Sequence, residues 1–351
     1  MPVQDSLRSN NFDGLRLVFA SMVLVFHSAL LSQEPQLTWV TYSVSSTFAV
    51  QAFFVVSGFL VTMSFENTKS LVSYGKKRFF RIAPAYIVVI LVAAVGLVRM
   101  STLSPTQYFI SPEWRSYVFS NLTLSNFKQP TLPGVFADRL EPAVNGSLWT
   151  IKLEVMFYCC VPLIVWAIRR FGYKPVLATL FAFSITWHAA FLYLGELHHS
   201  DLATRLAKQL PGQLAFFGGG AFAYYRTRDG LPPPPAWAAA LGVAGYALTQ
   251  GLVSTVVSPF CVTLIVYWAA IRVPQVWNAH RTGDFSYGLY LYHFPIAQVL
   301  IALGVFTVNP FGGVLLVFLL ALTASVLSWH LIEKHALKIA HWRVPKYSAV
   351  S

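Results

Sequence analysis

The N-terminal apolar segment contains two ionisable residues, Arg16 and His27, that could do chemistry. Eleven residues of α-helix turn through about 1100°, close to three full turns, so the two side chains share one helix face about 16 Å apart. An imidazole is the usual general base near neutral pH. The pair therefore indicates a base with a cationic neighbour. Alternatively, Arg16 reaches the membrane edge and His27 only hydrogen bonds to a neighbouring helix.

Glu154 is a third ionisable group within an apolar segment. We expect it to lie at a depth similar to that of His27 and to orient the imidazole, as the carboxylate does in hydrolase triads. Lys152 points away from Glu154 on a helix, because residues two apart do not face each other. The alternative for Glu154 is a structural hydrogen bond to a tyrosine.

Hydroxyl and aromatic side chains in other apolar segments are candidates for the lining of a pocket. Tyr287 and Tyr290 are three residues apart and share a helix face, which His293 continues. Such side chains suit a sugar or pantetheine channel, but they also suit ordinary helix packing. Ser57, which precedes a glycine, either lines the same pocket or permits close helix approach. Trp149 completes this set of candidates.

Two arginines, Arg78 and Arg81, form an Arg-x-x-Arg pair after two lysines. Guanidinium groups match the geometry of phosphate and pyrophosphate, so the pair is a candidate for binding a phosphorylated donor. The alternative is contact with anionic lipid headgroups.

The cysteines and histidines show no metal-binding spacing. Cys159, Cys160 and Cys261 lie in apolar runs, where a neutral thiol is a small hydrophobic side chain. The adjacent His198 and His199 point in different directions on a helix, which disfavours a shared metal. We therefore expect neither a metal nor a bound cofactor.

The composition predicts the elements that hold these residues. Of the 351 residues, 56% are hydrophobic and only 11% are charged, which excludes an ordinary soluble globule. Each membrane crossing needs about 20 apolar residues. The sequence therefore predicts one all-α domain over 1–351, a polytopic helical bundle of about ten transmembrane helices. The predicted spans are 12–32, 44–64, 82–100, 147–168, 174–195, 209–225, 236–252, 255–272, 284–306 and 311–333.

Charge predicts the orientation of this bundle. With ten spans, both termini lie on one side of the membrane, and most Lys and Arg residues of the connecting segments lie on that side. Because cytoplasmic loops carry an excess of Lys and Arg, we expect both termini to be cytoplasmic. The net charge of +12 has the same origin and does not indicate a nucleic-acid partner. Residues 65–81 are basic and partly apolar, which predicts a cytoplasmic interfacial helix. Residues 101–146 are polar and contain prolines, which predicts a long external loop.

Six segments, taken in order, resemble the acyltransferase family 3 membrane proteins. The resemblance covers nearly the whole chain, although His335 stands where a proline is common in the family. The segments are FDGLRLVFASMVLVFHS (12–28), AFFVVSGFLV (52–61), KKRFFRIAPAY (76–86), SLWTIKLEVMFY (147–158), FSYGLYLYHFPI (285–296) and WHLIEKHALK (329–338).

This resemblance implies a function and roles for particular residues. His27 would be the catalytic base, Arg16 would belong to the same site, and Arg78 and Arg81 would handle the donor. The family implies transfer of an acyl group, usually acetyl, from a cytoplasmic acyl-CoA co-substrate to a hydroxyl. The acceptor would be a carbohydrate such as a surface polysaccharide or glycolipid, at a bacterial cytoplasmic (inner) membrane.

Some family members carry an appended external domain, and we expect this chain to be the membrane module without an appended soluble domain. Acceptor choice would then depend on residues 101–146, on the bundle or on a separate external partner protein. The alternative function is a proton-coupled transporter or flippase, in which Arg16, His27 and Glu154 form a proton relay. A transporter would need a proton gradient and would release no coenzyme A.

Overall fold

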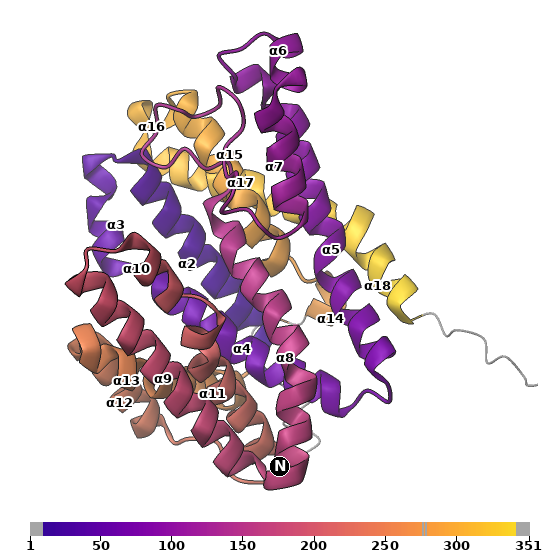
Figure 1. Cartoon of the computed structure of the whole chain (residues 1–351), viewed down its shortest axis with the longest axis vertical. Coiled ribbons are helices and arrows are strands. Elements are labelled where there is room, and N and C mark those ends of the chain that lie inside the picture. Colours follow the sequence, from indigo (N-terminus) through magenta and orange to yellow (C-terminus); the bar gives the residue numbers. More distant parts are fainter. Residues whose placement is uncertain (1–9, 276, 278, 342–351) are drawn as a thin grey trace, which may run out of the picture.

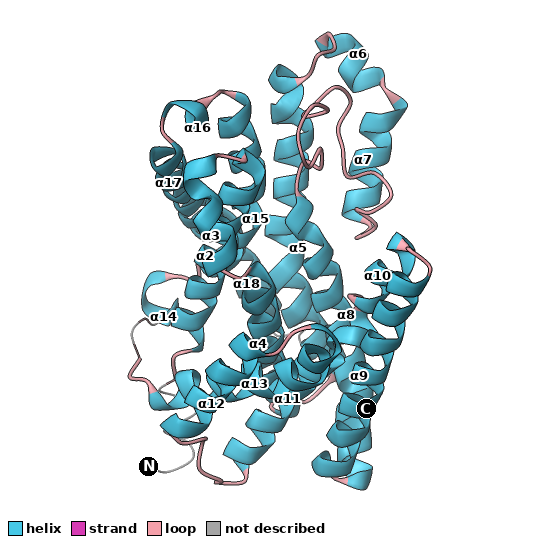
Figure 2. Cartoon of the chain, turned by 90° about the vertical axis from the view of Figure 1, so that its left-hand side faces the viewer, coloured by secondary structure: helices cyan, strands magenta, loops and turns pink. Residues whose placement is uncertain are grey.

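The computed structural model describes residues 10–275, 277 and 279–341. Throughout these residues every regular element is helical, and none is a strand (Figure 2). The predicted fold class, an all-α polytopic membrane bundle, is confirmed. The bundle follows from chemistry, because a helix satisfies its own backbone hydrogen bonds where lipid offers no partners.

Ten helices occupy the ten predicted spans (Figure 1). Among the residues that the structure describes, seven helical segments are long and apolar enough to cross a membrane, whereas α11, α12 and α15 are shorter or less apolar. The number of crossings and the side of the termini therefore stay predictions. The helices are α2 (Phe12–Ser32), α4 (Ser46–Glu66), α5 (Leu71–Gly96), α8 (Trp149–Phe171), α9 (Tyr173–Leu197), α11 (Leu210–Arg228), α12 (Ala236–Leu248), α13 (Gly251–Arg272), α15 (Ser286–Ala302) and α17 (Pro310–Ser328).

Shorter helices connect or extend these ten. A π-helical segment over Trp329–Glu333 joins α17 to the last helix. The short helices are α3 (Thr38–Ser43), α6 (Pro105–Ile110), α7 (Pro112–Leu122), α10 (Asp201–Ala207), α14 (Ala279–Thr282), α16 (Val305–Val308) and α18 (Lys334–His341).

Helix α2, which carries Arg16 and His27, packs against α4, α15 and α17. Both α15 and α17 are more than 250 residues away in the chain. Figure 1 shows this contact as indigo helices beside orange and yellow ones. The packing brings the Arg16 and His27 segment next to residues 284–293.

Helices α4 and α11 approach each other through glycines. A Cβ atom on Gly220 would lie 1.9 Å from the Val55 carbonyl oxygen, and one on Gly58 would lie 2.0 Å from the Phe217 carbonyl oxygen. Only glycine permits so short a separation between two backbones. The glycine run that lowers the hydropathy of α11 is therefore what allows this helix to pack closely against α4.

We expect Gly220→Leu to destabilise the protein by about 1–3 kcal/mol or more, because overpacking forces the two backbones apart. The matched control is Gly75→Leu on α5, where a Cβ atom meets nothing within 4 Å. Thermal unfolding in detergent measures both variants. Equal midpoints for the two variants would contradict the close contact.

Residues 65–81, which we expect to form a cytoplasmic interfacial helix, are divided in the structure between the end of α4 and the beginning of α5. Helix α4 runs to Glu66, a turn follows, and residues 71–81 are the first turns of α5, which continues through Pro84 to Gly96. The physical reason is the cap at Ser70, whose side chain accepts a hydrogen bond from the Ser73 backbone N–H and starts one continuous helix. The cytoplasmic location of this segment stays a prediction.

Residues 101–146 contain local structure rather than a plain loop. They form α6 and α7 and then an irregular chain that returns to the bundle. The Tyr86 hydroxyl donates to the Asn121 carbonyl oxygen at 2.8 Å, and the Gln298 amide donates to the Ala143 carbonyl oxygen at 3.1 Å. The segment is thus held against α5 and α15, and its external location stays a prediction.

Candidate active site

His27 on α2 and His293 on α15 form a pair of hydrogen-bonded imidazoles. Nδ1 of His27 lies 2.9 Å from Nε2 of His293. Nδ1 of His293 lies 2.8 Å from the Tyr290 carbonyl oxygen and 3.2 Å from that of Leu289. His293 is fully buried, whereas His27 is partly exposed.

The backbone carbonyls determine where the protons lie in the neutral pair. A carbonyl oxygen only accepts, so Nδ1 of His293 must carry a proton and its Nε2 must be an acceptor. His27 then donates from Nδ1 to His293, which leaves a lone pair on Nε2 of His27. This tautomer places a basic nitrogen on the side of His27 that faces away from His293.

Glu154 does not orient the imidazole, which corrects our expectation. Its carboxylate accepts a hydrogen bond from the Tyr158 hydroxyl, one helical turn away on α8. No hydrogen bond joins Glu154 to His27 in the described part of the chain. The orienting group is His293, which we had expected in the pocket lining and which lines neither of the two cavities described below.

Arg16 is held by a carboxylate that the sequence reasoning missed, that of Asp284. Nη1 of Arg16 lies 2.5 Å from Oδ2 of Asp284, and Arg81 bonds to the same oxygen. The other oxygen of Asp284 accepts from the hydroxyl and the backbone N–H of Ser286 at 2.6 and 3.2 Å. The available signal was a lone acidic residue directly before an apolar segment.

Asp284 lies in the turn before α15, outside the spanning helices. Burial raises the pKa of this carboxyl, but Arg16 and Arg81 lower it more, and its pKa ends well below the usual range. Asp284 is therefore ionised at physiological pH and holds both arginines in place.

The two arginines of the Arg-x-x-Arg pair have different surroundings. Arg81 lies between Asp284 and Glu333, whose Oε2 is 3.8 Å from Nη1 of Arg81. Arg78 has no carboxylate partner among the described residues. Its Nη2 donates to the Ser64 hydroxyl at 3.2 Å, while its Nε is buried without a hydrogen-bond partner. Of these two arginines, Arg78 is thus the one without a carboxylate partner among the described residues.

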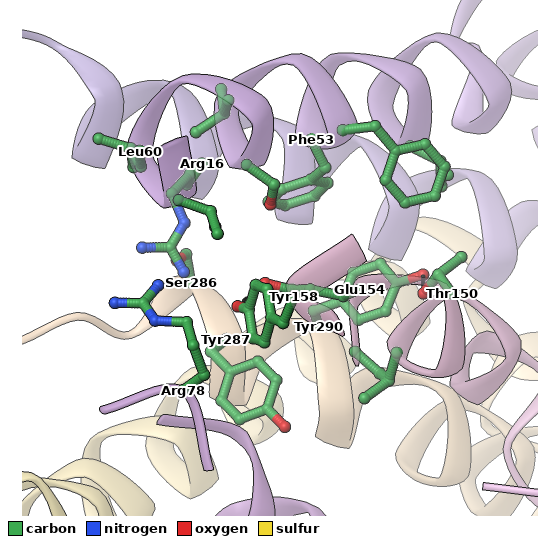
Figure 3. Close-up of a pocket in the computed structure, with 16 residues that line it drawn as sticks. Arg16, Phe53, Leu60, Arg78, Thr150, Glu154, Tyr158, Ser286, Tyr287 and Tyr290 are labelled. Atoms are coloured by element: carbon green, nitrogen blue, oxygen red, sulfur yellow. Dashed lines mark hydrogen bonds between the residues drawn. The ribbon is translucent and has the colours of Figure 1, made fainter. Parts of the chain in front are cut away.

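An inner cavity of about 90 Å³ gathers most of the predicted site residues between α2, α4, α5, α8 and α15. Figure 3 shows Arg16 and Arg78 pointing toward one another across it. Arg81 does not line this cavity, so the two arginines of the Arg-x-x-Arg pair differ in their access to it. The predicted residues that line the inner cavity are Arg16, Ser57, Arg78, Glu154, Tyr287 and Tyr290.

The two tyrosines of α15 also hold helices together. The Tyr287 hydroxyl donates to the Ile82 carbonyl oxygen of α5 at 2.9 Å. The Tyr290 hydroxyl lies 2.7 Å from the Thr150 hydroxyl of α8. Both roles considered for these residues, lining and packing, are therefore present in the structure.

A second cavity of about 400 Å³ lies between α2, α4, α9, α11 and α13. His27 and Trp149 line it, whereas Arg16 and Arg78 do not. Val50 and Tyr290 line both cavities, so the two spaces adjoin at these residues. His27 therefore lines one cavity and Arg78 the other, and the two cavities meet at Val50 and Tyr290.

In the described part of the chain, no three His, Cys, Asp or Glu side chains group in a way that could hold a metal ion. The site offers the imidazole of His27, the guanidinium of Arg78 and two adjoining cavities. Such a set can deprotonate a hydroxyl and bind an anionic group.

Comparisons with known proteins agree with this chemistry. A family model described as "Acyltransferase domain", acyltransferase 3, matches residues 9–330, which is most of the chain. A protein named O-acetyl transferase from Shigella phage Sf6 is 28% identical over 342 residues, covering 94% of this chain and 96% of that protein. Nodulation protein 10 from Rhizobium leguminosarum bv. viciae is 28% identical over 366 residues, covering 94% of each. No solved structure matches the chain.

Proposed function

This chain belongs to the acyltransferase 3 family and is an integral membrane acyltransferase, and from this premise we propose that it is an O-acetyltransferase. The donor is acetyl-CoA or a related acyl-CoA, used as a co-substrate. The acceptor is a hydroxyl of a carbohydrate, such as a surface polysaccharide or glycolipid. The name of the phage relative supports O-acetyl transfer.

The observation that carries the proposal is the hydrogen bonding of His27. Its Nδ1 is hydrogen bonded to His293, its Nε2 carries the free lone pair, and its side chain lines a cavity of about 400 Å³. A neutral imidazole in this state accepts a proton from a hydroxyl. His293 fixes the ring and shares the positive charge that forms on His27.

The reaction then balances with these groups alone. The acceptor hydroxyl gives its proton to Nε2 of His27, and its oxygen attacks the thioester carbonyl carbon. The C–O bond forms, the C–S bond breaks, and the proton returns from His27 to the leaving coenzyme A sulfur. In the second route, Nε2 attacks the thioester carbonyl carbon, an N–C bond forms, and coenzyme A leaves as its thiolate. The acceptor oxygen then displaces Nε2 from the acyl carbon, and the hydroxyl proton passes to the thiolate.

Arg78 is the residue best placed for the donor. Its guanidinium faces the inner cavity without a carboxylate partner among the described residues, and phosphate groups suit guanidinium forks. Arg16, Arg81 and Asp284 form a partly buried ion-pair cluster that joins α2, α5 and the turn before α15. We therefore assign donor binding to Arg78 and a positioning role to Arg81.

The cellular setting completes the proposal. We place the protein in a bacterial cytoplasmic membrane with both termini and Arg78 on the cytoplasmic side, where acyl-CoA is found. Residues 101–146 then face the exterior, where acceptor glycans or a separate partner protein would meet them. The lipid bilayer surrounds the apolar helices.

Donor turnover by the purified protein in lipid nanodiscs tests the proposed function. We expect acetyl-CoA to release free thiol without a proton gradient, and glycans added from membrane extracts to gain acetyl groups by mass spectrometry. His27→Ala should release almost none. Substrate uptake that depends on a proton gradient, with no thiol release, would overturn the proposal in favour of a transporter.

A further inference from the structure

The second cavity has a one-sided charge. Its lining contains His27, His188 and Lys208 but no aspartate or glutamate among the described residues. Lys208, the exposed residue that ends α10, lines this cavity, and its ammonium group has no hydrogen bond or ion pair with any residue the structure describes. A cation without a counter-ion in a partly enclosed space raises the local concentration of anions. The cavity is thus electrostatically suited to an anionic ligand.

Neutral polar groups in the same lining suit a ligand with many hydroxyls. Gln213 is 5% exposed, and its side-chain amide forms no hydrogen bond within the described residues. Gln51 accepts a hydrogen bond from Tyr246 through Oε1, which leaves its amide hydrogens available. An amide both donates and accepts, as sugar hydroxyls require. Further hydroxyl groups of the lining belong to Ser46, Thr47, Ser254 and Thr255.

Aromatic rings and size complete the chemistry of this cavity. Trp149, Phe216 and Tyr290 line it together with the polar groups. Such rings offer apolar faces beside polar handles, against which the carbon-bound hydrogens of a sugar can pack. A volume of about 400 Å³ lies within the range of small-molecule sites, about 300–1,000 Å³.

We propose that the second cavity is the acceptor site and that Lys208 selects a glycan bearing a carboxylate or phosphate group near the reacting hydroxyl. This inference rests on the proposed function, since His27 in the cavity wall supplies the base. In the proposed function, Arg78 binds the phosphate groups of the donor in the inner cavity. The two substrates thus approach Tyr290 from opposite sides.

Labelling of a single cysteine in the cavity tests the charge preference without relying on catalysis. Gln213→Cys is made in a background where Cys159, Cys160 and Cys261 are replaced by alanine. Its rates with an anionic sulfonate and a cationic trimethylammonium methanethiosulfonate are compared, each relative to the rate with free glutathione. We expect a preference of about 3- to 10-fold for the anionic reagent, because a nearby ammonium attracts it.

Matched substitutions show whether Lys208 causes the preference. Lys208→Gln should reduce the rate ratio to about one, whereas Lys208→Arg should keep it. The control is Lys174→Gln, a lysine that is exposed like Lys208 but lies near the other end of α9 and does not line the cavity, and it should leave the ratio unchanged. Ser254→Cys, on another wall, repeats the test if Gln213→Cys folds poorly. Equal rates for the two reagents, or a preference that survives Lys208→Gln, would overturn the proposal.

Protection by model ligands tests the occupant. In the Gln213→Cys protein, methyl glucuronoside should slow labelling of the introduced thiol more than methyl glucoside, from which it differs by one carboxylate. The difference should vanish when Lys208→Gln is added. Stronger protection by coenzyme A than by either sugar would instead make this cavity the donor site. Carbohydrate acetylation that continues after the introduced thiol is labelled would also overturn the acceptor assignment.

The proposed function has an independent readout, thiol release from acetyl-CoA. An anion preference without thiol release would show a charged cavity, but it would refute both the acetyltransferase function and the acceptor assignment. Thiol release without an anion preference would refute the role of Lys208 and leave the proposed function intact.

Discussion

His27→Ala is expected to lower the rate of acetyl transfer by about 10²- to 10⁴-fold, the usual contribution of a general base. The variant removes Nε2, the unprotonated nitrogen beside the second cavity. The fold should persist, because His27 is partly exposed and its one side-chain hydrogen bond among the described residues goes to His293. Initial rates of thiol release and of glycan acetylation in nanodiscs measure the effect.

Two other histidines give this prediction its controls. His198→Ala, at an exposed position after α9, should keep the wild-type rate. His293→Gln should lose less activity than His27→Ala and less than His293→Ala, because the glutamine oxygen can still accept from Nδ1 of His27. The pH profile of His293→Ala should also change, since the partner of the base is lost. A His27→Ala rate within a few-fold of wild type would refute the assigned base.

Arg78→Gln is expected to raise the KM for acetyl-CoA by about 10- to 100-fold, since a hydrogen bond to a charged group contributes about 1.5–3 kcal/mol. Arg78 has the one cavity-facing guanidinium without a carboxylate partner among the described residues. Arg78→Lys should recover only part of the affinity, because an ammonium lacks the planar fork. Binding of coenzyme A by calorimetry provides the second measurement.

Arg81→Gln is the matched variant from the same Arg-x-x-Arg pair, and we expect it to fail differently. It removes a partner of both Asp284 and Glu333, and breaking a buried ion pair costs about 3–5 kcal/mol. The variant should therefore lose thermal stability and expression, whereas Arg78→Gln should keep both. A stable Arg81→Gln protein with only a raised KM would show that Arg81 also binds the donor.

Local sequence determined the helices and the placement of Arg16 and His27 on one helix face. Apolar length alone predicts α2 over 12–32, the bounds that the structure shows, because a span of this kind depends on lipid and on its own backbone bonds. Helical periodicity likewise places Arg16 and His27 on one face, since both belong to one helix. Hydropathy did not reveal that 71–81 joins α5, because it reports solvent preference and not helix continuity.

Only the tertiary structure decided which residues are partners. His27 pairs with His293, and Arg16 with Asp284, across 266 and 268 residues of sequence. Hydropathy cannot predict such pairs, because an apolar helix surface packs equally well against lipid and against another helix. The same limit explains why Glu154 was expected beside His27 and why Asp284 was missed. Sequence thus determined which groups lie within apolar helices. Helix packing determined that Arg81 is paired with carboxylates and that His27, hydrogen bonded to His293, lines a cavity.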